Sequence, residues 1–407
     1  MLRPIVKSSK PRYLEFYYFD AGGGHRSAAT ALKQVIAERY PHWHVEMINL
    51  QELLQSADPL FRLAKVKSEN VYNGLLKRGW TYGSATLLRG LQKGIRIQTP
   101  KIKALLQEHW RSSRPDLVVS IIPNFNKVIF QALRSVHPDL PYVTVMTDIA
   151  DCPPHFWLER QDQYVICGND KAVKQACAKG YKSNRIFQVS GMVLKPSFYR
   201  AVKINRRAER IRLGLDPNLP TALIMFGGNG SKESAKIVKR LERSKCNVQS
   251  IILCGHNKKL QKRLQRRKSC HAIGFTDRVP ELMLLADFFI GKPGPGCISE
   301  ALHCGLPIIA DCNKRTMLQE RYNTKWIEKN KLGIVVKSFR KTSSAVDKLL
   351  NDGMLETYRQ NALRLRNRAV FEIPVIFECL MERTGVHSNI SVIKPTANTP
   401  LERSASI

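Results

Sequence analysis

The segment Gly291-Lys-Pro-Gly-Pro-Gly-Cys-Ile-Ser-Glu-Ala-Leu-His-Cys-Gly-Leu-Pro307 constrains the fold more than any other part of the chain. The run 282–290 before it ends in a short apolar burst, which is typical of a strand buried on both faces of a parallel sheet. Gly294 and Gly296 allow the backbone to approach a ligand closely, and a helix beginning near Ile298 points free N–H groups at phosphate. The segment therefore predicts a strand–turn–helix unit of an α/β fold with an anion site at its turn.

Glu300 follows this turn, and we place it in the first turn of the helix. Its carboxylate is positioned there to accept hydrogen bonds from a ribose diol, which together with the phosphate site suits a sugar nucleotide. The alternative is an ordinary turn in which Glu300 only complements the helix dipole.

A second glycine loop lies near the start of the chain. The aromatic-rich run 13–19 predicts a strand, Asp20-Ala-Gly-Gly-Gly-His-Arg-Ser27 turns sharply, and 28–40 has helical periodicity. His25 is therefore expected at a helix N-terminus just past the carboxyl end of a strand, where ligands bind in open α/β sheets. The helix dipole disfavours the imidazolium, so the neutral ring is available to take a proton from a hydroxyl. A capping or packing role is the alternative for this histidine taken alone.

The two loops together carry a family resemblance. Asp20-Ala-Gly-Gly-Gly-His-Arg-Ser-Ala28 and Pro293-Gly-Pro-Gly-Cys-Ile-Ser-Glu-Ala301 resemble the signatures of the monogalactosyldiacylglycerol synthase family. This family is a branch of the inverting glycosyltransferases that also holds the N-acetylglucosaminyltransferase making lipid II. Further segments resemble the family in order and spacing: Thr144-Val-Met-Thr-Asp148, Cys152-Pro-Pro-His-Phe-Trp157, Ser190-Gly-Met-Val-Leu-Lys-Pro-Ser-Phe198 and Gln319-Glu320 with Asn323. The resemblance spans residues 12–335 and implies the GT-B fold, with two Rossmann-like, doubly wound α/β domains facing across a cleft.

The resemblance also implies a reaction. His25 would deprotonate the 3-hydroxyl of 1,2-diacylglycerol as it attacks UDP-galactose, giving β-monogalactosyldiacylglycerol by inversion. Asp148 either orients His25 or takes the proton itself, and the sequence leaves both roles open. His155 would line the acceptor groove, with a structural loop histidine as the alternative.

The same resemblance places the donor UDP-hexose on the second domain. Glu300 would hold the ribose, Gly227 and Gly228 would border the diphosphate, and Gln319 with Glu320 would bind the hexose. The full set of expected donor-site residues is Lys195, Gly227, Gly228, Phe275, Gly294, Gly296, Glu300, Gln319 and Glu320. No Asp-x-Asp motif is present, so helix N-termini rather than a metal are expected to stabilise the leaving diphosphate, and no cofactor is expected.

Three departures from the family pattern concern the donor. Lys195 stands where arginine is usual, Cys297 replaces a threonine beside the phosphates, and Asp311-Cys-Asn-Lys-Arg-Thr-Met317 lacks the usual apolar-proline run. A UDP-glucose-dependent enzyme is therefore an alternative. A lipid II type UDP-N-acetylglucosamine transferase is another, although Gly22-Gly-Gly-His25 suits the diacylglycerol branch better.

The net charge of +33, from 66 Lys and Arg against 33 Asp and Glu, indicates a polyanionic partner. Basic residues of 60–115 alternate with apolar ones and with Trp80 and Tyr82, which favours an anionic membrane surface over specific nucleic-acid binding. A solvated basic face is the alternative reading, and a non-enzymatic polyanion-binding protein is the third functional hypothesis. No apolar run spans a bilayer and no signal peptide is evident, so we expect a cytoplasmic protein attached peripherally to the inner face of the membrane.

The 407 residues are too many for one ordinary core. We expect an acceptor and membrane-binding domain at 12–203, a UDP-sugar domain at 204–368, a helix at 369–385 packing back on the first domain, and a disordered tail at 386–407. The 10 cysteines lack Cys-x-x-Cys spacing, so free thiols are expected. The expected strands are 14–19, 44–49, 117–122, 142–147, 163–167, 185–188, 221–226, 250–254, 271–274, 287–290, 307–310 and 333–335.

Overall fold

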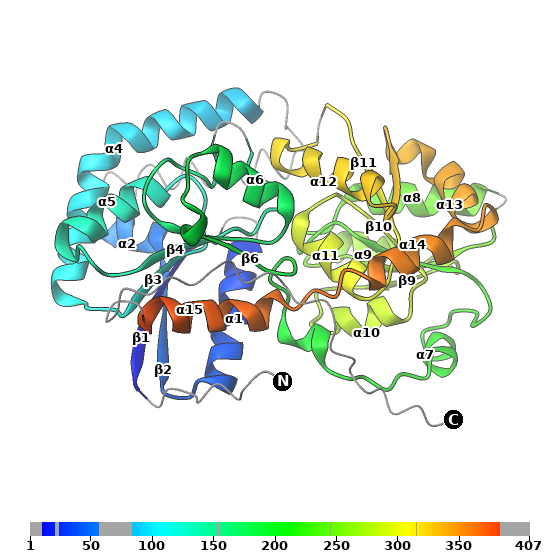
Figure 1. Cartoon of the computed structure of the whole chain (residues 1–407). Coiled ribbons are helices and arrows are strands. Elements are labelled where there is room, and N and C mark those ends of the chain that lie inside the picture. The colour runs from blue at the N-terminus through cyan, green and yellow to red at the C-terminus, as the bar shows by residue number, and fades with distance from the viewer. Residues whose placement is uncertain are drawn as a thin grey trace.

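Two wholly parallel sheets form the protein, with helices on both faces of each (Figure 1). The computed structural model describes residues 10–20, 24–56, 84–152, 155–244, 246–314 and 316–382. The predicted tail at 386–407 lies outside these residues. The two sheets confirm the expected α/β fold, and every expected strand is present with ends that move by one or two residues.

The first sheet has the strand order β2-β1-β3-β4-β5-β6. Its strands are β1 Arg12–Tyr18, β2 Trp43–Asn49, β3 Leu117–Ser120, β4 Tyr142–Val145, β5 Tyr164–Cys167 and β6 Ile186–Gln188. The accompanying helices are α1 Gly24–Arg39, α2 Leu50–Ser56, α4 Ser84–Ser112, α5 Asn126–Val136 and α6 Asp170–Ala178, with short 3-10 turns at Ser183–Arg185 and Pro196–Tyr199.

The second sheet has the strand order β12-β11-β10-β7-β8-β9. Its strands are β7 Thr221–Met225, β8 Gln249–Leu253, β9 Cys270–Ile273, β10 Phe288–Gly291, β11 Ile308–Asp311 and β12 Gly333–Val336. Its helices are α7 Arg206–Arg212, α8 Lys232–Arg243, α9 Lys258–Leu264, α10 Val279–Leu284, α11 Pro295–His303, α12 Leu318–Lys329, α13 Thr342–Asn351 and α14 Met354–Leu363, with a 3-10 turn at Phe339–Lys341.

Burial explains why these segments are strands. All five residues of β7 are buried, because α8 and α9 cover one face of the sheet while α10 and α11 cover the other. The edge strand β2 instead alternates buried and exposed residues over most of its length. Continuous apolar runs are characteristic of central parallel strands, which have no face in water.

The last helix, α15 Ala369–Glu382, returns from the second half of the chain to the first sheet (Figure 1). It packs against α1, and Phe377 meets Phe16 of β1 edge-on with 5.9 Å between ring centroids. The returning segment also touches the outgoing linker, since Asn367 Nδ2 donates to Met192 O at 2.8 Å. The two halves are thus joined by two chain segments that lie side by side.

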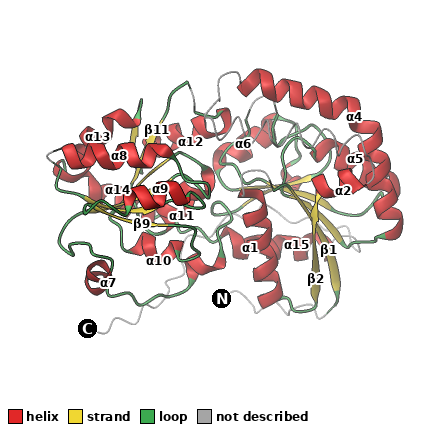
Figure 2. Ribbon diagram, turned by 180° about the vertical axis from the view of Figure 1, so that it is seen from behind, coloured by secondary structure: helices red, strands yellow, loops and turns green. Residues whose placement is uncertain are grey.

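Each sheet has a topological switch point, where consecutive strands turn in opposite directions from the starting strand. The switch lies between β1 and β3 in the first sheet and between β7 and β10 in the second. Figure 2 shows the strands of the two sheets in yellow, with β1 and β2 in the first sheet and β9 in the second. Ligands of open α/β sheets bind beyond the carboxyl ends of strands at such points. His25 follows β1, whereas Gly227 and Gly294 follow β7 and β10, so both glycine loops lie at switch points.

Candidate active site

His25 is the second residue of α1, at the carboxyl end of β1. Its Nδ1 lies 3.0 Å from Thr147 Oγ1, just beyond β4, and its ring lies against the Trp157 ring with 5.6 Å between centroids. Burial lowers the pKa of His25 to about 4, so the imidazole is neutral at physiological pH. A neutral ring with Nδ1 engaged leaves Nε2 for an incoming hydroxyl.

Asp148 directly follows Thr147, the partner of this histidine, and is only 6% exposed. Its Oδ2 accepts a hydrogen bond from Trp157 Nε1 at 2.8 Å. Burial raises the pKa of Asp148 to about 7, the carboxylates of Glu320 and Asp151 add to the rise, and the indole bond opposes it. The carboxyl group therefore changes charge near neutral pH, which suits a group that assists proton transfer.

The two groups meet through residues that the sequence did not single out. His25 is hydrogen-bonded to Thr147 rather than to Asp148, and Trp157 contacts both His25 and Asp148. Thr147 could have been found from the sequence, because it directly precedes the candidate residue Asp148. Nothing local in the sequence indicates that the indole of Trp157 folds back nine residues onto Asp148.

The loop that carries Trp157 is held at several points. Trp157 N donates to Asp151 Oδ1 at 2.7 Å, and Gln175 of α6 bonds both the N–H and the carbonyl of Asp151. His155 on this loop is exposed, with Nε2 at 2.7 Å from Lys179 Nζ. The imidazole of His155 therefore faces α6, and its expected place in the acceptor groove stays a prediction.

The donor turn begins its helix earlier than expected. Helix α11 begins at Pro295 with Gly294 as N-cap, and Ile298 N already donates to Gly294 O at 3.1 Å. Proline suits the first helical position because its fixed φ matches the helix and its missing N–H has no partner there anyway. The expectation that Glu300 stands in the first turn is therefore wrong: Glu300 lies in the second turn, and the free N–H groups are those of Gly296 and Cys297.

Glu300 is nonetheless an unusual carboxyl group. Burial raises its pKa to about 7, and the charge of Lys195 partly offsets this rise. Lys195 Nζ also lies 3.9 Å from Asp277 Oδ1, so the lysine sits between two acids at the edge of the second sheet. Burial raises the pKa of Cys297 to about 12, which keeps its thiol neutral beside the turn.

The other donor-side residues surround this turn. Gly227 adopts a φ of 86°, which favours glycine, and the loop ends where Ser231 caps α8 by accepting from Glu233 N at 3.1 Å. Gly228 lies in the same loop. Phe275, beyond β9, is 60% exposed and stacks on His256 with 4.3 Å between ring centroids and 13° between planes. This flat aromatic pair is suited to stacking a base.

Acidic groups gather at the start of α12. Glu320 is 5% exposed and lies 3.4 Å from Lys292 Nζ, while the neighbouring Gln319 is half-buried. Burial raises the pKa of Asp311, at the end of β11, to about 6, and the nearby Glu320 contributes to this rise. Lys292 and Asp311 are site residues that the sequence reasoning did not assign, although both directly follow or end buried strands.

Electrostatic pairs link the two halves of the site. The carboxylate of Glu320 on the second domain raises the pKa of Asp148 on the first, so the two groups lie within electrostatic range of each other. Arg321 and Cys152 are a second such pair. Glu320 Oε1 also lies 3.5 Å from the position that a Cβ on Gly294 would occupy, so the carboxylate that acts on Asp148 borders the glycine turn of α11.

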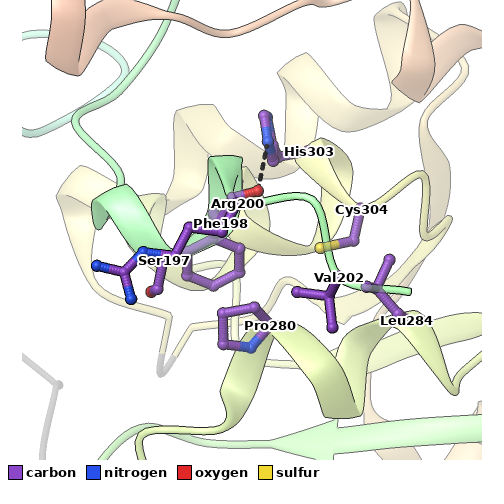
Figure 3. A pocket seen from close by; sticks show the side chains of 8 residues that line it. All are labelled: Ser197, Phe198, Arg200, Val202, Pro280, Leu284, His303 and Cys304. Atoms are coloured by element: carbon purple, nitrogen blue, oxygen red, sulfur yellow. Dashed lines mark hydrogen bonds between the residues drawn. The ribbon is translucent and has the colours of Figure 1, made fainter. Parts of the chain in front are cut away.

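A separate cavity of about 220 Å³ lies between the outgoing linker and the far end of α11 (Figure 3). His303 and Cys304 line one side, and His303 Nε2 lies 3.2 Å from Phe198 O of the linker. Because α11 starts at the glycine turn and ends at His303, this cavity is at the opposite end of the helix from the donor turn.

The predicted membrane residues Trp80 and Tyr82 lie outside the described residues. Helix α4, which follows them, exposes three basic side chains along its first half, Arg89, Lys93 and Arg96, and a fourth, Lys101, just after Pro100. Within the described parts of the chain, no helix has the length and apolar character needed to cross a bilayer.

Comparison with known proteins agrees with this geometry. The family model described as monogalactosyldiacylglycerol (MGDG) synthase matches residues 25–193, and the glycosyltransferase family 28 C-terminal domain matches residues 222–372. Monogalactosyldiacylglycerol synthase 1 of Arabidopsis thaliana, a chloroplastic protein, is 28% identical over 389 residues, covering 90% of this chain and 71% of its own. A probable monogalactosyldiacylglycerol synthase 3 of Oryza sativa subsp. japonica is 32% identical over 306 residues, covering 72% of this chain and 58% of its own.

Solved structures share the fold at low identity. Acinetobacter baumannii MurG superposes with a TM-score of 0.60 at 11% identity, covering 91% of this chain and 100% of its own. Anabaena Alr3699/HepE in complex with UDP superposes with a TM-score of 0.54 at 16% identity, over the same shares of the two chains. The chain is a glycosyltransferase of the GT-B fold and belongs to the monogalactosyldiacylglycerol synthase family.

Proposed function

We propose that this protein transfers galactose from UDP-galactose to the 3-hydroxyl of 1,2-diacylglycerol with inversion, giving β-monogalactosyldiacylglycerol. The observation that carries the proposal is that Trp157 contacts both His25 and Asp148, while Glu320, beside the glycine turn, acts on Asp148. The Arabidopsis relative is named a monogalactosyldiacylglycerol synthase and the rice relative a probable one, which supports the choice of sugar and acceptor.

In this mechanism the acceptor hydroxyl binds at His25 Nε2 and attacks the anomeric carbon from the face opposite UDP. The C–O bond to the sugar forms as the bond to the diphosphate breaks, and the hydroxyl proton passes to His25. Ionised Asp148 stabilises the imidazolium that forms, since opposite charges in a buried site attract strongly. This mechanism predicts a rate that rises with pH through the pKa of Asp148, near 7.

The donor would lie along the carboxyl ends of β7, β10 and β11. Phe275 with His256 would stack the uracil, Glu300 would accept from the ribose diol, and Gln319 with Glu320 would bind the hexose. The N–H groups of Gly296 and Cys297 and the loop of Gly227 and Gly228 would stabilise the leaving diphosphate, with Lys195 as an added point charge. The proposed reaction uses these fixed dipoles and requires neither a metal ion nor another cofactor.

We further propose that the enzyme works while attached peripherally to the inner face of a membrane. The charge of +33 and the exposed basic side chains of α4 support this placement, because the cytoplasmic leaflet is anionic. Trp80 and Tyr82 remain the proposed interfacial anchors, and His155 remains a proposed acceptor-side residue. No specific nucleic-acid partner is proposed.

The test is product formation on liposomes of diacylglycerol and an anionic phospholipid, with UDP-galactose, UDP-glucose and UDP-N-acetylglucosamine offered separately. We expect a β-galactosyl-diacylglycerol from UDP-galactose. His25→Ala should lower kcat by roughly 100-fold or more, the usual worth of general base catalysis. His42→Ala, at an exposed histidine outside the site, is the matched control and should leave kcat unchanged.

Product from UDP-glucose alone would assign the alternative hexose, for which the departures at Asp311 and Cys297 would be the reason. Product from UDP-N-acetylglucosamine would move the chain to the lipid II branch. If no donor gives product while the protein binds the liposomes, the proposed function is wrong.

A further inference from the structure

Trp157 has a position that simple core packing does not require. Its side chain is fully buried, yet it makes one directional polar contact, from Nε1 to Asp148 Oδ2 at 2.8 Å. The centroid of the same ring lies 5.6 Å from that of the His25 ring, with 57° between the two planes. One side chain therefore contacts both groups that the proposed mechanism uses.

The backbone of Trp157 is fixed from both sides. Its N–H donates to Asp151 Oδ1 at 2.7 Å, and its carbonyl accepts from the fully buried Asn126 Nδ2 at 3.2 Å. Asn126 Oδ1 in turn accepts from Tyr142 and Thr144 of β4, the strand that leads to Thr147 and Asp148. The indole is thus held by the same strand whose end it must reach.

We propose that Trp157 is the positioning residue of this active site, holding the Asp148 carboxylate in place with its N–H and supporting the His25 ring by ring contact. This inference rests on the proposed function for its catalytic consequence. Trp157 acts through Asp148 and His25 and does not itself touch the reacting atoms.

The charges around Asp148 make this hydrogen bond matter. Glu320 of α12 and Asp151 of the same loop act on Asp148 through their charges, and Asp148 in turn raises the pKa of Cys152. Burial and the neighbouring acids favour the protonated carboxyl of Asp148. The indole N–H acts against them, because its hydrogen bond favours the ionised carboxylate. Removing it would leave Asp148 uncharged over more of the physiological pH range.

The chain offers a closely matched control. Trp110 is also fully buried, and its Nε1 donates to Glu15 Oε2 at 2.8 Å, the same distance as in the Trp157 pair. Glu15 belongs to β1, and its other carboxylate oxygen lies 3.2 Å from His109 Nε2 of α4. Trp110→Phe therefore removes the same kind of bond at a comparable depth without touching the proposed site.

The experiment compares pH profiles of kcat and kcat/KM on diacylglycerol liposomes for the wild type, Trp157→Phe, Trp110→Phe, Asp148→Asn and Trp157→Phe with Asp148→Asn. For Trp157→Phe we expect the acidic limb to move up by about one to two pH units, as follows from losing one hydrogen bond to a charged group. The rate at pH 7 should fall about 10-fold and recover largely by pH 9. KM for the donor should change less than about twofold, because the donor site is not altered.

The double variant tests the route of the effect. If Trp157 acts through Asp148, Trp157→Phe should cost little further activity once Asp148 is asparagine. Site-specific replacement of Trp157 by benzothienylalanine, which keeps the ring size and lacks the N–H, should reproduce the pH shift if the phenylalanine variant folds poorly. The proposal would be overturned if the rate of Trp157→Phe fell by the same factor at every pH, as expected for Trp110→Phe, and the shape of its pH profile matched that of the wild type.

Failure of the proposed function can be told apart from failure of this inference. The Asp148 and Trp157 contact also affects the pH dependence of the free energy of unfolding, which needs no substrate. If the wild type transfers no sugar but Trp157→Phe still shifts the titration of Asp148 seen in unfolding, the contact stands and only the reaction is misassigned. If neither titration nor rate responds, Trp157 is a packing residue.

Discussion

Asp148 loses most of its contact with water on folding, and this desolvation decides its chemistry. The same physical cause acts on Glu300 and on His25, in opposite directions, because burial always favours the neutral form. Asp287 shows the contrast: it is also largely buried, but Thr221 N donates to it, Arg210 and Arg206 pair with it, and its pKa is lowered. In the described part of the chain, no ion pair of this kind is found at Asp148 or Glu300.

Asp148→Asn should stabilise the protein at neutral and alkaline pH. The folded-state pKa is raised above the unfolded value, so the folded protein binds more protons than the unfolded chain and stability falls as pH rises from about 4 to 7. Asparagine removes this penalty while still accepting from Trp157. We expect a gain of roughly 2 to 4 kcal/mol in the free energy of unfolding at pH 8, and almost none at pH 4.

Asp287→Asn is the control with the opposite sign, measured by the same chemical denaturation. Because the pKa of Asp287 is lower in the folded protein, this carboxylate stabilises the fold at any pH above its pKa in the unfolded chain. The stabilisation is lost as the pH falls through the pKa of the folded protein. The variant should therefore be destabilised at pH 8 and less so at acidic pH. Equal behaviour of the two asparagine variants would contradict the assignment of burial as the cause.

Glu300→Gln tests the donor side. If the ionised carboxylate accepts from the ribose diol, its loss should raise KM for the UDP-sugar by about 10- to 100-fold, the worth of a hydrogen bond to a charged group, with a smaller effect on kcat. Glu281→Gln, on the neighbouring α10, is a control outside the donor turn. An unchanged KM would return Glu300 to a purely structural role.

At the scale of the element, α4 divides into two parts with different surroundings. Its second half buries Ile102, Leu106 and Trp110, a stripe at intervals of four residues that packs into the first domain. Its first half exposes basic side chains, and Ile97 is 71% exposed. Pro100 lies at the boundary and removes one backbone hydrogen bond there.

Neutralising the exposed basic side chains of the first half, together with Lys101 just after Pro100, should weaken membrane attachment. The variant Arg89→Gln, Lys93→Gln, Arg96→Gln and Lys101→Gln is expected to lower affinity for anionic vesicles by about 100-fold or more, since each cation near the surface is worth about 1 kcal/mol. The control replaces four exposed cations of α9, namely Lys258, Lys259, Lys262 and Arg263. Vesicle sedimentation at two salt concentrations measures both, and equal losses would assign the binding to overall charge rather than to α4.

At the scale of the whole molecule, two chain segments join the domains and are hydrogen-bonded to each other. Asn367 donates to Met192 O, Arg368 N donates to Ser190 Oγ at 2.7 Å, and Ser190 N donates to Glu372 Oε2 at 2.8 Å. Between them, Gly191 has no room for a side chain, because an added Cβ would lie 2.6 Å from Asn367 Cγ. Asn367 is only 8% exposed and is itself bonded, so it has little freedom to move.

Gly191→Ala should therefore lower the free energy of unfolding by about 1 to 3 kcal/mol, the usual cost of overpacking. Gly94→Ala is the matched control, since nothing lies within 4 Å of an added Cβ and α4 is helical there. That substitution should stabilise by up to about 1 kcal/mol. A neutral Gly191→Ala would mean that the two linkers separate easily.

The sequence by itself determined the strand and helix alternation and the positions of both glycine loops. Strands such as β7 and β10 are apolar because both of their faces are covered by helices. Each such run can be recognised in the sequence without knowledge of its neighbours. The sequence predicts the start of α11 near Ile298, whereas the structure begins the helix at Pro295. Proline is common both in turns and at the first helical position, so this local signal is ambiguous beside two glycines.

Only the tertiary structure decided which side chains meet. Thr147 reaches His25 across 122 residues, Trp157 turns back onto Asp148, and Glu320 of the second domain approaches Asp148 of the first. These contacts depend on how two sheets, several loops and two linkers pack together, and burial then sets the pKa values of the groups they enclose. The propensity of single residues and the spacing of motifs describe local segments only. They therefore cannot predict which distant side chains meet or how far these side chains exclude water.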